Sequence, residues 1–209
     1  IGSDPGVTAA FNGATHMPFE DGALYMTVPG AVVIDSCDYV QTKSLTKKLA
    51  EYPKLSYMRL IRKNFKTIYA DGSEFEIGKG VTLKDGKDVT IIASGIMLDE
   101  ALRAEEILSA EGISARVIDM HTWKPIDEEL ICKAAEETGC IVTAENHQVG
   151  CGLGSAVANV LVANKPVPME RVGIQDRFGQ VGPQDFLMKE YNLMAEDIVE
   201  AVKKVISRK

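Results

Sequence analysis

Basic side chains are the first thing that this sequence has little of. It holds 23 Lys and Arg against 30 Asp and Glu in 209 residues, which gives a formal net charge of −7. A surface that binds nucleic acid or an anionic membrane needs a basic face, so we expect neither partner. The sequence also lacks the apolar run of about 18 residues that spans a bilayer. It has no basic start followed by an apolar stretch, as a signal peptide would, and we expect a cytoplasmic protein.

Cysteine is scarce too, and no two cysteines form a C-x-x-C pair. The four are unevenly spaced, at Cys37, Cys132, Cys140 and Cys151. This spacing suggests neither a disulfide framework nor a zinc site, so we expect reduced thiols that pack as small apolar side chains and no metal bound by this chain. With 45% hydrophobic and 25% charged residues, the composition is typical of a globular protein with one large or two small domains.

Only three histidines occur, and His16 has the most informative surroundings. It lies on the glycine-containing loop 12–17, directly before Pro18. Proline fits the first turn of a helix, and Glu20 and Asp21 would follow near the positive helix end, so we predict a helix from about Pro18. Imidazole exchanges protons near neutral pH, and loops at the edge of rigid elements often carry binding chemistry. Local features leave two interpretations open, a site histidine or one that only caps or packs.

The N-terminal part, residues 1–65, has the pattern of the second half of an α/β layer. An apolar, β-branched run at 31–35 predicts a buried strand, and a helix over 38–51 and a strand over 56–62 follow. Arg62 ends that strand, and ligands of open parallel sheets gather beyond the carboxyl ends of strands. A guanidinium can hold a phosphate with its planar fork, but it can equally make a surface ion pair at a strand end.

Residues 66–87 are rich in turn signals and predict a linker hairpin. From residue 88 on, strand and helix patterns alternate. We predict strands at 89–93, 115–120, 140–145 and 170–174, and helices at 98–111, from an N-cap at Asp127, at 155–164 and at 195–206. The predicted fold class is α/β, with a partial α/β layer followed by a three-layer α/β/α domain over 88–209 whose sheet is mostly parallel.

Several conspicuous residues of the C-terminal part have simpler explanations than catalysis. The glycine-rich turn 150–154 lacks the spacing of a nucleotide loop and favours a tight turn that allows close helix packing. Glu145 and His147 lie at a strand end and just after it, so both could line a crevice. His121 and Trp123 precede Lys124-Pro125 and are predicted to pack in a loop.

The motif Gly13-Ala14-Thr15-His16, with Pro18 and Glu20 behind it, resembles the substrate-channel motif in the pyrimidine-binding domain of transketolases. The segments 118–127 and 143–147 are similar to the carboxyl-terminal domain of the same family. The resemblance assigns that domain mainly to subunit assembly, so Glu145 and His147 would be interface or structural residues. The resemblance covers essentially the whole chain. It is less specific to one reaction, because deoxyxylulose phosphate synthases and the beta chains of 2-oxo acid dehydrogenases share both domains.

The resemblance implies roles for several residues of the N-terminal part. His16 would contact the hydroxyls of the donor sugar and exchange protons with them, with Asn12 and Thr15 as further substrate-binding residues. Arg62, in the segment 60–64, would bind the sugar phosphate. Two positions depart from the family pattern. Asn12 replaces an aspartate and cannot accept a proton as a carboxylate would, and Asp4 replaces a histidine and would repel phosphate.

The resemblance also implies that cofactor binding lies mainly outside this chain. Residues 1–65 would be the end of a pyrimidine-binding domain, 66–87 a linker and 88–209 the carboxyl-terminal domain. The family's catalytic glutamate and its aromatic platform for the cofactor lie upstream of the matching region, and the site for thiamine diphosphate and Mg²⁺ belongs to another domain. We therefore expect the chain to be inactive alone and to need an N-terminal half or subunit, in a homodimer or heterotetramer.

The expected reaction is the transfer of a two-carbon ketol unit from a ketose to an aldose, as in the pentose phosphate pathway, on sugar or sugar-phosphate substrates. Two alternatives remain open. The chain could come from a deoxyxylulose phosphate synthase or a 2-oxo acid dehydrogenase beta chain. It could also be a dimerisation or assembly module with no catalytic duty.

Overall fold

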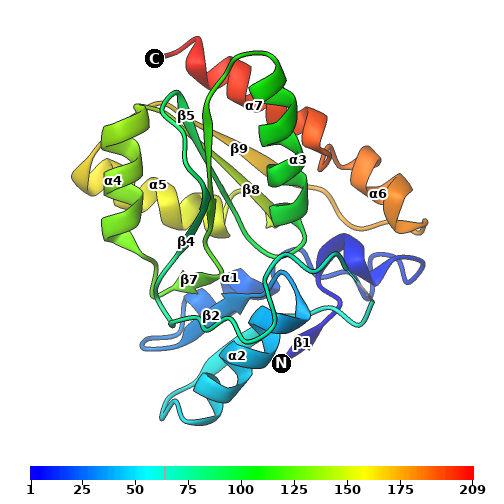
Figure 1. Cartoon of the computed structure of the whole chain (residues 1–209). Helices are drawn as coiled ribbons and strands as arrows, with labels where there is room; N and C mark the ends of the chain where they lie inside the picture. The colour runs from blue at the N-terminus through cyan, green and yellow to red at the C-terminus, as the bar shows by residue number, and fades with distance from the viewer. Residues whose placement is uncertain (64) are drawn as a thin grey trace.

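The computed structural model describes residues 1–63 and 65–209, and the strands form two sheets, one below the other in Figure 1. Asn64, the last residue of the segment 60–64, lies outside the described residues. The elements follow in the order β1 (Gly2–Ser3), η1 (Gly6–Ala9), α1 (Asp21–Met26), β2 (Val32–Asp35), α2 (Tyr39–Ala50), β3 (Ser56–Leu60), β4 (Val81–Lys84), β5 (Val89–Ala93), α3 (Met97–Ala110), β6 (Ala115–Asp119), β7 (Thr122–Lys124), α4 (Glu128–Thr138), β8 (Ile141–Gln148), α5 (Leu153–Asn164), β9 (Met169–Ile174), α6 (Gln184–Glu190) and α7 (Ala195–Ile206).

The first sheet has the strand order β1-β3-β2-β7. β1 and β2 pair with β3 in parallel, whereas β7 pairs with β2 antiparallel. The loop predicted around Trp123 is therefore wrong, because this segment is a strand that crosses over from the C-terminal part. The burial of Trp123 holds this segment in the first sheet. Trp123 is 1% exposed and its Nε1 donates to Ser94 Oγ at 3.0 Å.

The second sheet has the order β4-β6-β5-β8-β9 and is parallel except at β4. Helices α3 and α7 pack on one face and α4 and α5 on the other (Figure 1). Because both faces are covered, β5 and β6 are buried along their whole length, as expected for a parallel sheet. The predicted α/β class, with a mostly parallel sheet between two helical layers, is confirmed. Among the described residues no helix is long and apolar enough to cross a membrane.

Helix ends in this fold are set by side chains close in sequence. Asp38 Oδ1 accepts the N–H of Gln41 at 2.8 Å at the start of α2. Asp127 Oδ1 accepts the N–H of Leu130 at 3.1 Å at the start of α4, which confirms its predicted N-cap role. Gly139 ends α4 with a φ of 70°, a conformation that glycine adopts at no steric cost.

Two local predictions differ from the structure because of contacts distant in sequence. α1 begins at Asp21, three residues after Pro18, since the carbonyls of Pro18 and Phe19 accept N–H groups of Gly6 and Gln148 at 2.9 and 2.8 Å instead of continuing the helix. The linker hairpin is also wrong. Residues 66–87 are all described and contain one strand, β4. This strand pairs antiparallel with β6 of the second sheet and not with a second strand of a hairpin.

Candidate functional site

The loop that carries His16 is a tight, well-anchored turn between η1 and α1. Phe11 and Gly13 have φ values of 72° and 74°, and the N–H of His16 donates to Gly13 O at 3.0 Å. Met17 and the neighbouring Phe19 are buried and hold the end of the loop. His16 itself is exposed, so its imidazole can reach a ligand.

The structure brings Thr15 and His16 together. Thr15 Oγ1 lies 2.8 Å from His16 Nδ1, and this hydrogen bond orients the ring and leaves Nε2 for another partner. Asn12 is exposed on the same loop, where its N–H donates to Ala9 O at 3.1 Å. The three predicted residues of this motif therefore share one exposed turn.

The His16 loop packs against the segment 175–182 of the C-terminal part. Phe11 N–H donates to Gly182 O at 2.9 Å, and a Cβ on Gly179 would lie only 2.9 Å from Met17. A groove of about 800 Å³ runs along this junction, lined by Ala14, Met17, Phe19 and Glu20 together with 148–151 and 175–179. The loop thus forms one wall of a groove whose other walls come from β8 and from the segment after β9.

Arg62 lies two residues beyond β3, at a cavity of about 560 Å³ beside the carboxyl ends of β2 and β3. Its Nε pairs with Asp4 Oδ2, and its backbone N–H donates to Asp4 Oδ1 at 2.9 Å. The described residues show no hydrogen bond or ion pair between Arg62 and the His16 loop. The four predicted site residues therefore fall into two places, and the charge of Arg62 is already matched by a carboxylate.

A buried charge cluster at the centre of the molecule was missed by the sequence patterns. Arg59, 0% exposed, donates from Nε and Nη2 to Asp21 at 2.9 and 3.1 Å and from Nη2 to Asn146 O at 2.9 Å. Its Nη1 lies 3.3 Å from Asp35 Oδ2, and Tyr57 adds a hydrogen bond to Asp21 at 2.8 Å. Arginine inside a strand is the signal that could have revealed it, since a charged side chain there needs partners.

The cluster joins the two parts of the chain and shifts the pKa values of its carboxyl groups. Burial is the largest single influence on Asp21 and raises its pKa, but the charge and hydrogen bonds of Arg59, together with His147 and Tyr57, lower it by more in sum, so the net pKa lies below its usual range. For Asp35 burial outweighs Arg59, and the pKa is raised. Asp21 and Asp35 come from α1 and β2, whereas Asn146 comes from β8. Arg59 thus pins the first sheet to the second.

Glu145 and His147 at the end of β8 are wholly buried. Glu145 accepts the N–H groups of Leu153 and Gly154, both at 2.8 Å, at the start of α5, while burial raises its pKa to about 8. His147 donates from Nδ1 to Gln148 O at 3.0 Å, and burial lowers its pKa to about 4. Both side chains hold neighbouring backbone in place, in agreement with a structural role.

The glycine-rich turn before α5 is explained by these carboxylate contacts. A Cβ on Gly152 would lie 1.9 Å from Glu145 Oε2, and one on Gly154 would lie 2.9 Å from Oε1. The turn lets backbone approach a buried carboxyl group, so the predicted tight turn has a specific physical reason.

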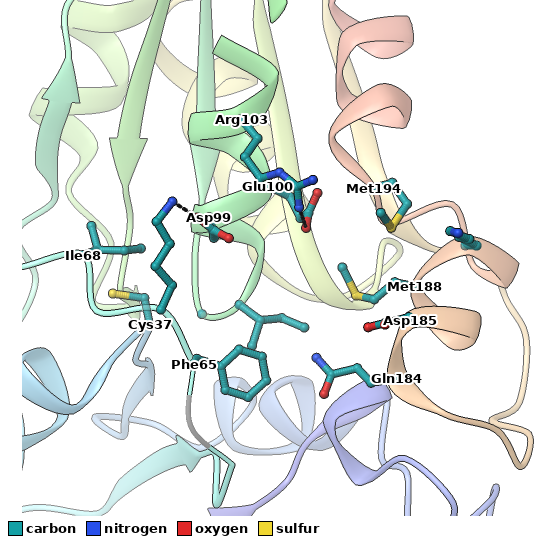
Figure 2. Close-up of a pocket in the computed structure, with 14 residues that line it drawn as sticks. Cys37, Phe65, Ile68, Asp99, Glu100, Arg103, Gln184, Asp185, Met188 and Met194 are labelled. Atoms are coloured by element: carbon teal, nitrogen blue, oxygen red, sulfur yellow. Dashed lines mark hydrogen bonds and ion pairs between the residues drawn. The ribbon is translucent and has the colours of Figure 1, made fainter. Parts of the chain in front are cut away.

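A further cavity, of about 380 Å³, separates Cys37 and the segment 65–68 from α3 and α6 (Figure 2). Four of its charged side chains are matched in pairs. Lys66 Nζ lies 2.7 Å from Asp99, and Arg103 Nη1 lies 3.1 Å from Glu100. None of the four predicted site residues lines it.

The donor set does not fit a divalent metal. In the described ranges 1–63 and 65–209, no group of three or more His, Cys, Asp or Glu could hold a metal ion.

Comparisons with known proteins cover the chain from end to end. The family model described as "Transketolase, C-terminal domain" matches residues 78–198. The 6-deoxy-6-sulfo-D-fructose transketolase subunit SqwH of Clostridium sp. (strain MSTE9) is 44% identical over 209 residues, which are 100% of this chain and 65% of that protein. One of the subunits of the apulose-4-phosphate transketolase of Phocaeicola vulgatus is 40% identical over 100% of this chain and 67% of its own length.

The fold agrees with these matches. A solved structure described as "Split gene transketolase, inactive beta4 tetramer" superimposes with a TM-score of 0.92 at 44% identity, over 98% of this chain and 65% of that one. The chain thus spans about two thirds of the length of each of these three relatives.

Proposed function

The chain belongs to the transketolase family, and we propose that it is the C-terminal subunit of a split transketolase that depends on thiamine diphosphate. The observation that carries this proposal is the match of fold and sequence to a split transketolase over 98% of the chain. The reaction is the transfer of a two-carbon ketol unit from a ketose to an aldose. Residues 1–65 are assigned to the end of the pyrimidine-binding domain and 88–209 to the carboxyl-terminal domain.

His16 is assigned to proton exchange with the hydroxyls of the donor sugar. Support comes from its exposure and from the hydrogen bond of Nδ1 to Thr15, which leaves Nε2 for substrate. Imidazole suits this exchange because it gains and loses a proton near neutral pH. Asn12 and Thr15 are assigned to substrate contacts on the same turn, and Arg62 is assigned to the substrate from its own cavity.

The partner is an N-terminal subunit that binds the diphosphate and its Mg²⁺. Family membership implies thiamine diphosphate, which supplies the carbanion chemistry when bound. The described residues of this chain offer no cluster for the metal, so the proposal assigns that site to the partner. By itself, the chain is expected to be inactive, and the active form is expected to be a heterotetramer of two subunits of each kind.

The relatives differ in the sugars named for them. One is named for a sulfonated fructose and another for apulose 4-phosphate. Both names describe ketoses with an acidic group, so the proposal places the donor in this class or among the corresponding uncharged ketoses.

Affinity capture of the chain from its native lysate, followed by activity assays of the recovered complex, tests the proposal. We expect a stoichiometric partner that contains the metal-binding segment and ketol transfer only when both subunits are present. Turnover by the purified 209-residue chain alone would contradict the predicted dependence on a partner. A complex that condenses pyruvate or acts in a 2-oxo acid dehydrogenase would favour the two related enzyme classes instead.

Substitution of His16 separates catalysis from mere assembly. His16→Ala in the reconstituted complex is expected to lower kcat/KM by about 10²-fold or more, the usual contribution of a proton-transferring group. His16→Asn, which keeps a hydrogen-bonding side chain but exchanges no proton, is expected to be similarly slow. An unchanged rate in both variants, with assembly intact by size-exclusion chromatography, would leave the chain with an assembly role only.

A further inference from the structure

The charges beside the carboxyl end of β3 are organised around Asp4. Asp4 directly follows β1, is 3% exposed and has a φ of 56°. Its N–H donates to Leu60 O at 2.7 Å, and its Oδ1 accepts the backbone N–H of Arg62 at 2.9 Å. A positive φ is uncommon for a residue with a Cβ, so these contacts hold the backbone and fix the carboxylate against Arg62.

Asp4 removes the net charge of the arginine but leaves part of it accessible. Oδ2 of Asp4 accepts a hydrogen bond from Arg62 Nε, while the Arg62 side chain remains 73% exposed. Arginine carries five N–H donors, so several remain for a ligand in the adjoining cavity. Arg62 can therefore donate hydrogen bonds to a ligand in this cavity, but its positive charge there is compensated by Asp4.

The two lysines of the cavity are weaker substitutes for the positive charge that an unpaired Arg62 would supply. Lys43 and Lys63 also line the cavity, and Lys43 lies 3.9 Å from Asp71. An ammonium on a long exposed stem is a mobile point charge, whereas the fixed carboxylate of Asp4 is buried beside the guanidinium. A ligand group bound to Arg62 must therefore lie within reach of a negative charge.

This arrangement affects ligand groups according to their charge. A hydroxyl group feels no net repulsion from Asp4, and by Coulomb's law a dianion feels twice the repulsion that a monoanion does at the same place. A phosphate monoester carries a charge of about −1.5 to −2 at pH 7. Compared with an unpaired Arg62, the Asp4–Arg62 pair therefore attracts this substituent less, and the loss is larger for it than for a singly charged or an uncharged group.

We propose that Asp4 is a specificity-determining residue of the ketose site, which through its pairing with Arg62 selects sugars whose far end is uncharged or singly charged and rejects phosphate monoesters. The inference rests on the proposed function, because it takes Arg62 to meet the far end of the donor sugar. It adds that the distal contact is made by hydrogen bonding and not by neutralisation of a dianion.

The test uses the reconstituted complex and two donors that differ only in a terminal phosphate, D-fructose and D-fructose 6-phosphate. Asp4→Asn removes the charge, keeps an oxygen that can accept from Arg62, and suits a positive φ, which asparagine tolerates. We expect the ratio of kcat/KM for the phosphorylated over the free sugar to rise at least about tenfold. Asp185→Asn, the same charge change at an exposed position on α6, is expected to leave the ratio within about twofold of the wild type.

A second measurement needs no variant. The second pKa of a phosphate monoester is about 6, so its charge falls as the pH is lowered from 7.5 to 5.5. As the pH is lowered over this interval, the ratio of kcat/KM for the phosphorylated over the free sugar is expected to rise in the wild-type complex. It is expected to rise less in Asp4→Asn.

Three results would overturn the inference. A ratio in Asp4→Asn within twofold of the wild type would remove Asp4 from specificity. A wild-type complex that already prefers the phosphorylated donor by tenfold or more would do the same. No ketol transfer from any donor by a correctly assembled wild-type complex would overturn the proposed function itself, and this inference with it.

Discussion

Replacing Arg59 by methionine is expected to produce a large loss of stability. Methionine fills much of the same space, but it leaves the carboxyls of Asp21 and Asp35 buried without their cation, and Asn146 O loses a donor. Among the described residues, the partner left to Asp21 after the change is Tyr57 OH, and the partner left to Asp35 is Ser94 Oγ. Removing one partner of a buried ion pair typically lowers the free energy of unfolding by about 3–5 kcal/mol.

This magnitude is large against the total stability of a domain. For a chain of 150–250 residues, each kcal/mol shifts the melting temperature by about 2–4 °C, so Arg59→Met is expected to lower it by roughly 6–20 °C. Chemical denaturation followed by circular dichroism, with the melting temperature as a second readout, measures both quantities. Arg59→Lys keeps the charge but not the planar fork, so its stability is expected to lie between that of the wild type and that of Arg59→Met.

The matched control is Arg103→Met. Arg103 also pairs with one carboxylate, Glu100 at 3.1 Å, but it is half exposed, and such pairs contribute about 0–1 kcal/mol. A loss of less than about 1 kcal/mol for Arg59→Met, or an equal loss in both variants, would refute the reasoning that burial makes the Arg59 cluster decisive.

Two further predictions concern the glycine-rich turn and two buried carboxyl groups, Glu145 and Asp119. Gly152→Ala is expected to lower the free energy of unfolding by more than about 1 kcal/mol, because its Cβ would meet Glu145 and His147, whereas a Cβ at Gly150 meets nothing within 4 Å. Equal melting temperatures for the alanine variants of Gly152 and Gly150 would contradict this. The pKa of Glu145 is raised to about 8 and that of Asp119 to about 7, both mainly by burial, so their contributions are fully present below the unfolded pKa values and are lost as the pH rises through the folded values. The urea midpoint is therefore expected to fall between pH 6.5 and 8, and to fall less in Glu145→Gln; an identical fall in both proteins would remove Glu145 from the explanation.

Much of the C-terminal fold could be predicted from the sequence because its signals are local. The segments that became β5, β6, β8 and β9 each contain a short run rich in apolar or β-branched residues, and the intervening helices have apolar residues at helical spacing. Asp127 caps α4 through a bond to an N–H only three residues away. The position of His16, exposed on a loop before a helix, also follows from neighbouring residues, whereas its role stays a prediction.

What only the tertiary structure decided involves partners far apart in the chain. From its sequence neighbours alone, Arg62 looks like a phosphate-binding residue. Asp4, 58 positions away, compensates its positive charge. Arg59 finds its partners on α1, β2 and β8, and β7 joins a sheet whose other strands all precede residue 61. A side chain's sequence neighbours determine whether it favours a helix, strand or turn, but the charge and hydrogen-bonding state of a buried group depends on whatever the fold packs against it. The sequence by itself therefore determined the elements and the exposed histidine loop, and the tertiary contacts decided which charges remain available to a ligand.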